Sequence, residues 1–125
     1  MAARDAGDVV RQVHEYFNAR QFDQIDDLFT PDFFSHPLGT TGFAAAKEIW
    51  RRLVAEYPDY RVVDEDIIVD HDKVAVRCSL EGLPESDVQP MLIEIFRVEN
   101  GRLAEAWGLG QGAPVHVIHT SDVTH

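Results

Sequence analysis

The sequence contains little of what disulfide bonding, metal binding or nucleotide binding requires. Cys78 is the only cysteine among the 125 residues, so no disulfide can form within the chain. It lies in an apolar strand pattern with Val74 and Val76, which indicates a buried structural thiol rather than a nucleophile. No CxxC or HExxH motif occurs and no glycine-rich loop follows a strand. We therefore expect neither a metal nor a cofactor.

Positive charge and long apolar runs are also scarce. The chain has 11 Lys and Arg against 22 Asp and Glu, a formal net charge of -11. Such a surface repels phosphate backbones and anionic lipids, so we expect no nucleic-acid partner and no membrane. No apolar run is long enough to cross a bilayer, and residues 1–10 lack the apolar core of a signal peptide. Together with the single cysteine, this predicts a cytoplasmic protein.

The composition that is present is typical of one globular domain. Hydrophobic residues make up 45% of the chain and charged residues 26%. No repeat or low-complexity tract divides the sequence. We predict a single domain over residues 1–125, in which residues 112–125 form a C-terminal tail or an edge strand.

Apolar periodicity predicts helices in the first half and strands in the second, an α+β architecture. The stripe of the first helix comprises Val9, Val10, Val13 and Phe17, with Asp5 or Asp8 as N-cap. The second comprises Phe22, Ile25, Leu28 and Phe29, and residues 30–32 end it. A third helix spans residues 42–57, where the following proline stops it. The period then changes to two and predicts strands at 61–70, 73–80, 91–99 and 102–110, with a loop at 83–90.

The dipeptide Asn100-Gly101 predicts a tight hairpin between the last two strands. With this dipeptide as a two-residue loop, Glu94 lies opposite Trp107. The predicted face of Glu94 is apolar with polar interruptions: Leu92, Glu94, Phe96, Val98, Leu103, Glu105, Trp107, Leu109 and Gln111. This mixture is typical of a ligand pocket, whereas a slip of one residue at the turn would change the cross-strand pairs. Glu94 is thus either held in a pocket or solvated on an open sheet face.

Several segments in this order resemble the SnoaL-like polyketide cyclase and ketosteroid isomerase branches of the NTF2-like superfamily. They are "FTPDFFSHPLGTTG" (29–42), "EYPDYRVVDEDIIVDHDKVAVR" (56–77), "IEIFRVENGRLAEAW" (93–107) and Gln111 followed by Pro114. The resemblance covers about residues 9 to 114. It implies an NTF2-like cone, in which three N-terminal helices pack on a strongly curved antiparallel sheet around one deep pocket. It also implies a homodimer.

The resemblance assigns roles to two residues. His36 falls where the steroid isomerases have the aspartate that moves the substrate proton, and Glu94 falls where they keep a protonated carboxylic acid. The isomerases' oxyanion tyrosine falls near Val13, with Tyr16 one turn away, and the cyclases' acid/base aspartate is Gln111 here. The cyclases' histidine-bearing loop is similar only to a shortened "GLPESDVQP", and the Asp-Arg-Asp arrangement of epoxide hydrolases is not evident.

The favoured hypothesis is a cofactor-independent isomerase or cyclase that moves a proton on an apolar, carbonyl-containing small molecule. His36 would be the base and Glu94, kept neutral by apolar walls, the acid or oxyanion donor; the reverse assignment is also open. The residues expected to contact the substrate are Tyr16, Phe33, Trp50, Arg77, Phe96, Trp107 and Gln111. The alternative is a non-catalytic small-molecule-binding or dimerisation domain, since this fold hosts both.

Simpler interpretations exist for the same residues. His36 could cap a helix or face solvent, and Glu94 could form a buried ion pair with Arg77. Glu105 is expected to be structural, near the narrow end of the cone. Among the other histidines, His14 and His125 are expected in solvent and His71 in a turn. His116 and His119 are three apart, which on a strand makes a poor metal pair.

Overall fold

The computed structural model describes residues 5–112. Its helices are α1 (Ala6–Asn18), the short α2 (Phe22–Ile25), which continues into the 3-10 turn η1 (Asp26–Leu28), and α3 (Ala44–Glu56). Asp5 is the N-cap of α1, because its carboxylate accepts the backbone N–H of Asp8 at 2.9 Å. The first and third predicted helices are confirmed, whereas the second ends at Ile25, so Leu28 lies in the 3-10 turn and Phe29 in a strand. Within the described residues, no helix has the length and apolar character needed to span a membrane.

One six-stranded sheet follows the order β2-β1-β6-β5-β4-β3. Its strands are β1 (Phe29–Ser35), β2 (Thr40–Thr41), β3 (Arg61–Asp70), β4 (Lys73–Glu81), β5 (Met91–Glu99) and β6 (Arg102–Gln111). The four long strands β3 to β6 form an antiparallel meander, as predicted. Of the predicted C-terminal tail or edge strand at residues 112–125, residues 113–125 lie outside the described residues.

Strand β1 corrects the prediction for residues 29–35. Thr30 to Asp32 were expected only to end a helix, but they lie inside β1, which pairs parallel with β6. The sheet is therefore mixed rather than wholly antiparallel. Pro31 has no backbone N–H to donate, and the pairing of β1 with β6 changes register between Phe29 and Phe34. Because proline usually marks the end of a strand or helix, β1 was not predicted from the alternation of apolar and polar residues.

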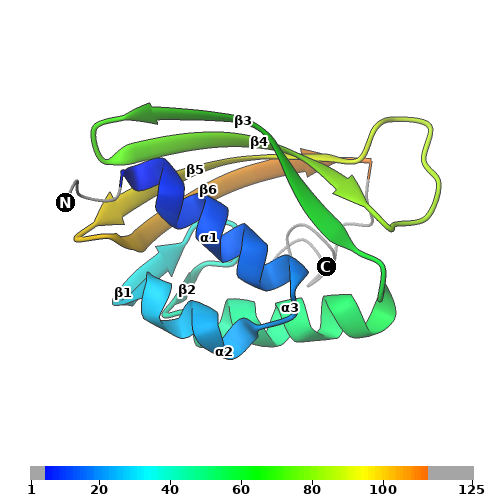
Figure 1. Ribbon diagram of the computed structural model, residues 1–125. Coiled ribbons are helices and arrows are strands. Elements are labelled where there is room, and N and C mark those ends of the chain that lie inside the picture. Colours follow the sequence, from blue (N-terminus) through cyan, green and yellow to red (C-terminus); the bar gives the residue numbers. More distant parts are fainter. Residues whose placement is uncertain (1–4, 113–125) are drawn as a thin grey trace.

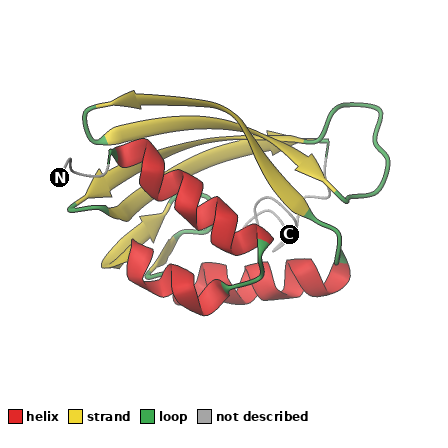
Figure 2. Cartoon of the chain, in the orientation of Figure 1, coloured by secondary structure: helices red, strands yellow, loops and turns green. Residues whose placement is uncertain are grey.

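All helices lie on one side of the sheet, so the molecule has an inner, covered face and an outer face (Figures 1 and 2). Helix α1 crosses beneath β3 and β4, and α2 and α3 form the layer farthest from those strands. The core between the layers includes the fully buried Val9, Val10, Ile25, Val74 and Leu103. This open α+β architecture leaves space between α1, α3 and the inner sheet face.

A β-bulge in the β5–β6 hairpin overturns the predicted cross-strand pairs. Asn100 and Gly101 form the turn with φ of 52° and 77°, as expected, and Val98 pairs with Leu103. The next pair joins Arg97 to Glu105, which leaves Ala104 as an extra residue on β6. Glu94 therefore lies opposite Gly108 and not Trp107. The bulge turns Trp107 and Glu105 to the outer face and keeps Glu94 on the inner face.

Candidate functional site

A cavity of about 110 Å³ lies between α1, β1, α3 and the inner face of the sheet. Most of its wall is apolar and includes Phe17, Phe29, Phe33, Trp50, Phe96 and Leu103. The ring of Trp50 meets that of Phe17 edge to face, with centroids 5.2 Å apart. Four polar side chains, His14, Ser35, Tyr60 and Glu94, complete the wall. An apolar cavity with a few polar groups is the usual form of a small-molecule site.

Glu94 reaches this cavity from the middle of β5. Gly108 lies opposite it, and a Cβ at that position would come within 3.2 Å of Glu94 Cγ, so the glycine makes room for the carboxylate chain. The Glu94 side chain is 21% exposed. Burial raises the pKa of Glu94 to about 7, against a smaller opposing effect of His14. Near neutral pH the group can therefore both hold and release a proton.

His14 faces Glu94 from α1, although the sequence reading expected it in solvent. His14 is only 7% exposed, and its Nε2 lies 3.9 Å from Glu94 Oε1. Its Nδ1 lies 2.5 Å from Asp64 Oδ1, at the opposite edge of the ring. Helical spacing could have revealed this, because His14 is four residues after Val10 and three before Phe17, both on the buried stripe.

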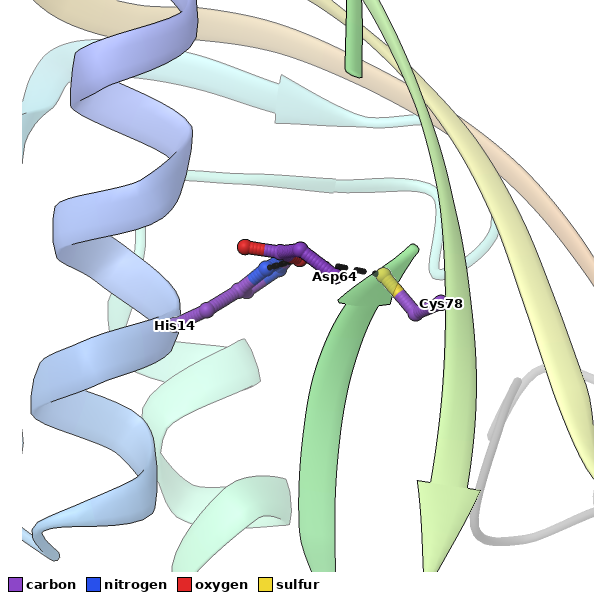
Figure 3. A group of neighbouring side chains, drawn as sticks. All are labelled: His14, Asp64 and Cys78. Atoms are coloured by element: carbon purple, nitrogen blue, oxygen red, sulfur yellow. Dashed lines mark hydrogen bonds and ion pairs between the residues drawn. The ribbon is translucent and has the colours of Figure 1, made fainter. Parts of the chain in front are cut away.

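Asp64 and Cys78 complete a polar cluster behind His14 (Figure 3). Cys78 is fully buried, as predicted, and its Sγ lies 3.4 Å from Asp64 Oδ1. The atoms of His14, Asp64 and Cys78 that could bind a metal ion lie within 4.8 Å of one another. No sequence motif predicts this group, because the three residues are far apart in the chain. However, tetrahedral zinc would hold its nitrogen and oxygen ligands about 3.3 Å apart. The 2.5 Å between His14 and Asp64 suits a hydrogen bond instead.

Tyr60 brings a phenol to the cavity from the residue before β3. It is 4% exposed, and burial, with the nearby charge of Glu94, raises the pKa of its hydroxyl. The phenol therefore stays protonated and can act as a donor. The sequence reading looked for a tyrosine on α1, near Val13 and Tyr16. Tyr16 does not line the cavity, and its hydroxyl accepts a hydrogen bond from Gln12 at 3.3 Å.

His36 lies away from Glu94, so the expectation that these two side chains share one cavity is wrong. Its Nε2 lies 2.6 Å from Glu105 Oε2, and its ring stacks on Trp107 with centroids 4.7 Å apart. Both partners are on the outer face because of the bulge at Ala104. His36 directly follows the end of β1, and Ser35, the last residue of that strand, faces the cavity in its place.

The other predicted contact residues divide between the two faces. Phe33, Trp50 and Phe96 line the cavity as expected. Trp107 and Gln111 line a groove on the outer face, and Gln111 donates to the carbonyl of Gln89. Arg77 does not pair with Glu94; its Nε donates to Asp66 Oδ2 at 2.7 Å. Glu105, expected near the narrow end of the cone, is instead bound by His36 and Arg97.

Comparison with known proteins identifies the family of this chain. Residues 10–106 match the family described as SnoaL-like domain. The chain belongs to this family. No functionally curated protein matches the chain. The SnoaL-like assignment agrees with the fold, which is that of the NTF2-like superfamily.

Solved structures similar to this SnoaL-like chain share its fold at low sequence identity. A SnoaL-like polyketide cyclase from Agrobacterium tumefaciens is 16% identical, with a TM-score of 0.76 over 87% of this chain and 93% of that one. IdmH from Streptomyces antibioticus, a candidate polyketide cyclase, is 22% identical, with a TM-score of 0.75 over 98% and 100%. A candidate ketosteroid isomerase from Kribbella flavida is 18% identical, with a TM-score of 0.71 over 87% and 79%.

Proposed function

We propose that this protein is a cofactor-independent enzyme of the isomerase or cyclase type, which moves a proton on an apolar, carbonyl-containing small molecule. One observation carries the proposal: His14 Nε2 and Glu94 Oε1 lie 3.9 Å apart in the wall of one apolar cavity. His14 takes the place that the sequence reading had given to His36. The fold is shared with proteins described as cyclases and isomerases, which supports the class of reaction but not the substrate.

The two groups suit opposite halves of a proton transfer. The imidazole of His14 accepts a proton from the carbon beside the carbonyl, and the C–H electron pair becomes the enolate. Asp64 stabilises the imidazolium that forms. Glu94, protonated because of its raised pKa, donates a hydrogen bond or its proton to the oxygen that gains charge. The proton on His14 then returns to the product at the same or another carbon.

The walls favour an uncharged substrate. Among the described residues that line the cavity, none is Lys or Arg, and the imidazole of His14 and the carboxyl group of Glu94 are its only histidine and acidic side chains. A carboxylate or phosphate would enter without a counter-charge, at a large desolvation cost. A cavity of about 110 Å³ is near the size that holds one small aromatic ring, so we expect a compact ketone, or the reacting end of a larger one.

Deuterium uptake tests this proposal. Candidate ketones are incubated with the enzyme in D₂O, and exchange at the carbon beside the carbonyl is followed by NMR or mass spectrometry. His14→Ala and Glu94→Gln should each lower the exchange rate by about 10²-fold or more. His36→Ala is the matched control and should exchange at the wild-type rate. Equal rates in wild type, His14→Ala and Glu94→Gln would end the proposed roles.

The outer face supports a second proposal, that two copies associate as a homodimer. Ile93, Ile95 and Leu109 are 47%, 43% and 78% exposed on this face, beside a groove of about 340 Å³. Exposed apolar side chains grouped in this way are typical of protein interfaces. Ile95→Glu should shift the molecule toward the monomer in analytical ultracentrifugation, whereas Ile68→Glu, at the sheet edge strand, should have a smaller effect. A wild-type monomer at all concentrations would contradict it.

A further inference from the structure

We propose that Asp64 and Cys78 act as positioning residues that hold neutral His14 as its Nδ1–H tautomer, with the lone pair of Nε2 directed at the cavity. The catalytic meaning of this arrangement rests on the proposed function, but the tautomer itself is a property of the resting protein. The proposal follows from three contacts at the two edges of one imidazole ring (Figure 3).

The first contact joins the Nδ1 edge to Asp64. An ionised carboxylate has only acceptor atoms, so the 2.5 Å contact requires a proton on Nδ1. Burial acts to raise the pKa of Asp64, but the hydrogen bond and charge of His14, with the Cys78 thiol, outweigh burial and leave this pKa below its ordinary 3.8. Asp64 therefore remains an acceptor throughout the neutral range.

The second contact joins Asp64 to Cys78 on the neighbouring strand β4. Burial raises the pKa of the Cys78 thiol, with further increases from the charges of Glu94 and Asp64, so the group stays an S–H donor. Its Sγ lies 3.4 Å from the same Oδ1 that accepts from His14. Two donors from two different elements thus converge on one oxygen. The two hydrogen bonds restrain rotation of the Asp64 carboxylate. While both are present, Oδ1 of Asp64 acts only as an acceptor.

The third contact concerns the Nε2 edge, which faces the cavity. Nε2 lies 3.9 Å from Glu94 Oε1, too far for a direct hydrogen bond in the resting protein. A neutral ring already protonated on Nδ1 has an unprotonated Nε2, which is the atom that a base needs. The other charged groups around this cluster are those of a surface groove between α1 and β3: Arg11, Glu15, Arg61 and Glu65. None of these is among the residues that line the inner cavity.

The arrangement separates the two edges of the ring. His14 lines both the inner cavity and the surface groove that contains Asp64. The Asp64 side chain is 22% exposed and the His14 side chain 9%. The carboxylate of Asp64, which orients the ring, thus lies on the side of the surface groove, and Nε2 of His14 lies on the side of the apolar cavity. An ionised carboxylate in the cavity would repel an enolate, whereas the raised pKa of Glu94 keeps that carboxyl group protonated below about pH 7.

Long-range ¹H–¹⁵N NMR of ¹⁵N-histidine-labelled protein, at mildly alkaline pH, reads this tautomer directly. The His14 signals are assigned by their loss in His14→Gln. We expect a protonated Nδ1 and an unprotonated Nε2 in wild type. Asp64→Ala removes the acceptor and should abolish this preference, whereas Asp66→Ala, two residues along β3 and bound to Arg77, should leave the His14 signals unchanged. A protonated Nε2 in wild type, or an unaltered Nδ1–H signal in Asp64→Ala, would overturn the proposal.

Conservative variants separate the tautomer from its effect on proton transfer. Asp64→Asn keeps an oxygen acceptor, so it should retain the Nδ1–H signal, but it removes the charge and should slow ketone exchange by about 10²-fold or more. Cys78→Ala removes the second donor to Asp64 and should weaken the Nδ1–H preference, and Cys78→Ser, which keeps a donor, should restore it. An unchanged Nδ1–H signal in Cys78→Ala would remove Cys78 from the positioning role. Wild-type exchange in Asp64→Asn would remove the positioning role. An inactive wild type with the expected tautomer would instead contradict the proposed function and leave the tautomer standing.

Discussion

The hairpin β5–β6 carries two glutamates, one on each face of the sheet, and each lies close to a histidine from elsewhere in the chain. On the inner face, Glu94 approaches His14 at 3.9 Å inside an apolar cavity. On the outer face, Glu105 meets His36 at 2.6 Å and also accepts from Arg97 at 3.0 Å. The residue types are the same and the positions are only eleven residues apart, yet the environments are opposite.

The pKa values of the two carboxyl groups move in opposite directions for this reason. Burial raises the pKa of Glu94 to about 7, whereas hydrogen bonds from His36 and Arg97 lower the pKa of Glu105. Glu94 is therefore suited to exchange a proton near neutral pH, and Glu105 to remain a charged partner in an ion-pair network. The difference between the two faces shows that burial among apolar side chains, and not a neighbouring histidine, raises the pKa of a glutamate toward neutrality.

The largest expected difference between the two pairs is in activity. Glu94→Gln removes the titrating proton from the cavity and should slow deuterium exchange by about 10²–10³-fold. Glu105→Gln is the same substitution on the outer face and should leave the exchange rate within about threefold of wild type. Both rates are measured with one ketone in D₂O. A larger loss in Glu105→Gln than in Glu94→Gln would reverse the functional assignment of the two faces.

The packing of the same hairpin should show the next largest contrast. Leu103 is fully buried on the inner face, so Leu103→Ala should lower the free energy of unfolding by about 2–5 kcal/mol. Leu109 is 78% exposed, so Leu109→Ala in the monomer should cost less than about 0.5 kcal/mol. Urea denaturation measures both. If Leu109→Ala has a larger cost that grows with protein concentration, the outer face is buried between copies.

The stability of the inner pair should depend on pH. The pKa of Glu94 is raised from 4.5 to about 7, so the folded protein holds more protons than the unfolded chain between these values, and stability falls as pH rises through that window. Glu94→Gln removes this cost. The variant should gain up to about 3 kcal/mol over wild type at pH 8 and little at pH 4. Thermal melts at both pH values check this, and an equal gain at both would contradict the raised pKa.

The outer pair should show the smallest effect and the opposite sign. A lowered pKa means that Glu105 stabilises the fold above its ordinary pKa and that this contribution is lost as pH falls through the lowered value. Glu105→Gln should therefore lower the melting temperature slightly at neutral pH and low salt. The difference should shrink in acid and in high salt, because the side chains of Glu105, His36 and Arg97 are partly exposed to solvent. A salt-independent difference would indicate a packing role for Glu105.

Much of the architecture follows from local patterns, and the site follows from them only in part. The apolar stripe of α1, the period-two strands from Arg61 onward and the turn at Asn100-Gly101 all predicted the observed elements. Glu94 was also identified correctly as a carboxyl group in an apolar wall. The histidine close to Glu94 was not identified correctly. The prediction assumed a β5–β6 pairing without a bulge, and it took the position of His36 from the family resemblance. His14 could have been found from its place on the buried stripe, whereas Asp64 and Tyr60 had no such signal.

The sequence predicts most of the helices and strands, with β1 and β2 as exceptions, because spacing of apolar residues at 3.6 or 2 decides which side chains can be buried together. It also determined that a carboxyl group interrupts the apolar face of β5. Only the tertiary structure decided what that carboxyl group meets. One extra residue, Ala104, turns Glu105 and Trp107 outward, and the crossing of α1 beneath β3 and β4 brings His14 to Asp64, 50 residues away in the chain. Contacts of this kind depend on register and packing angle, which no local pattern encodes.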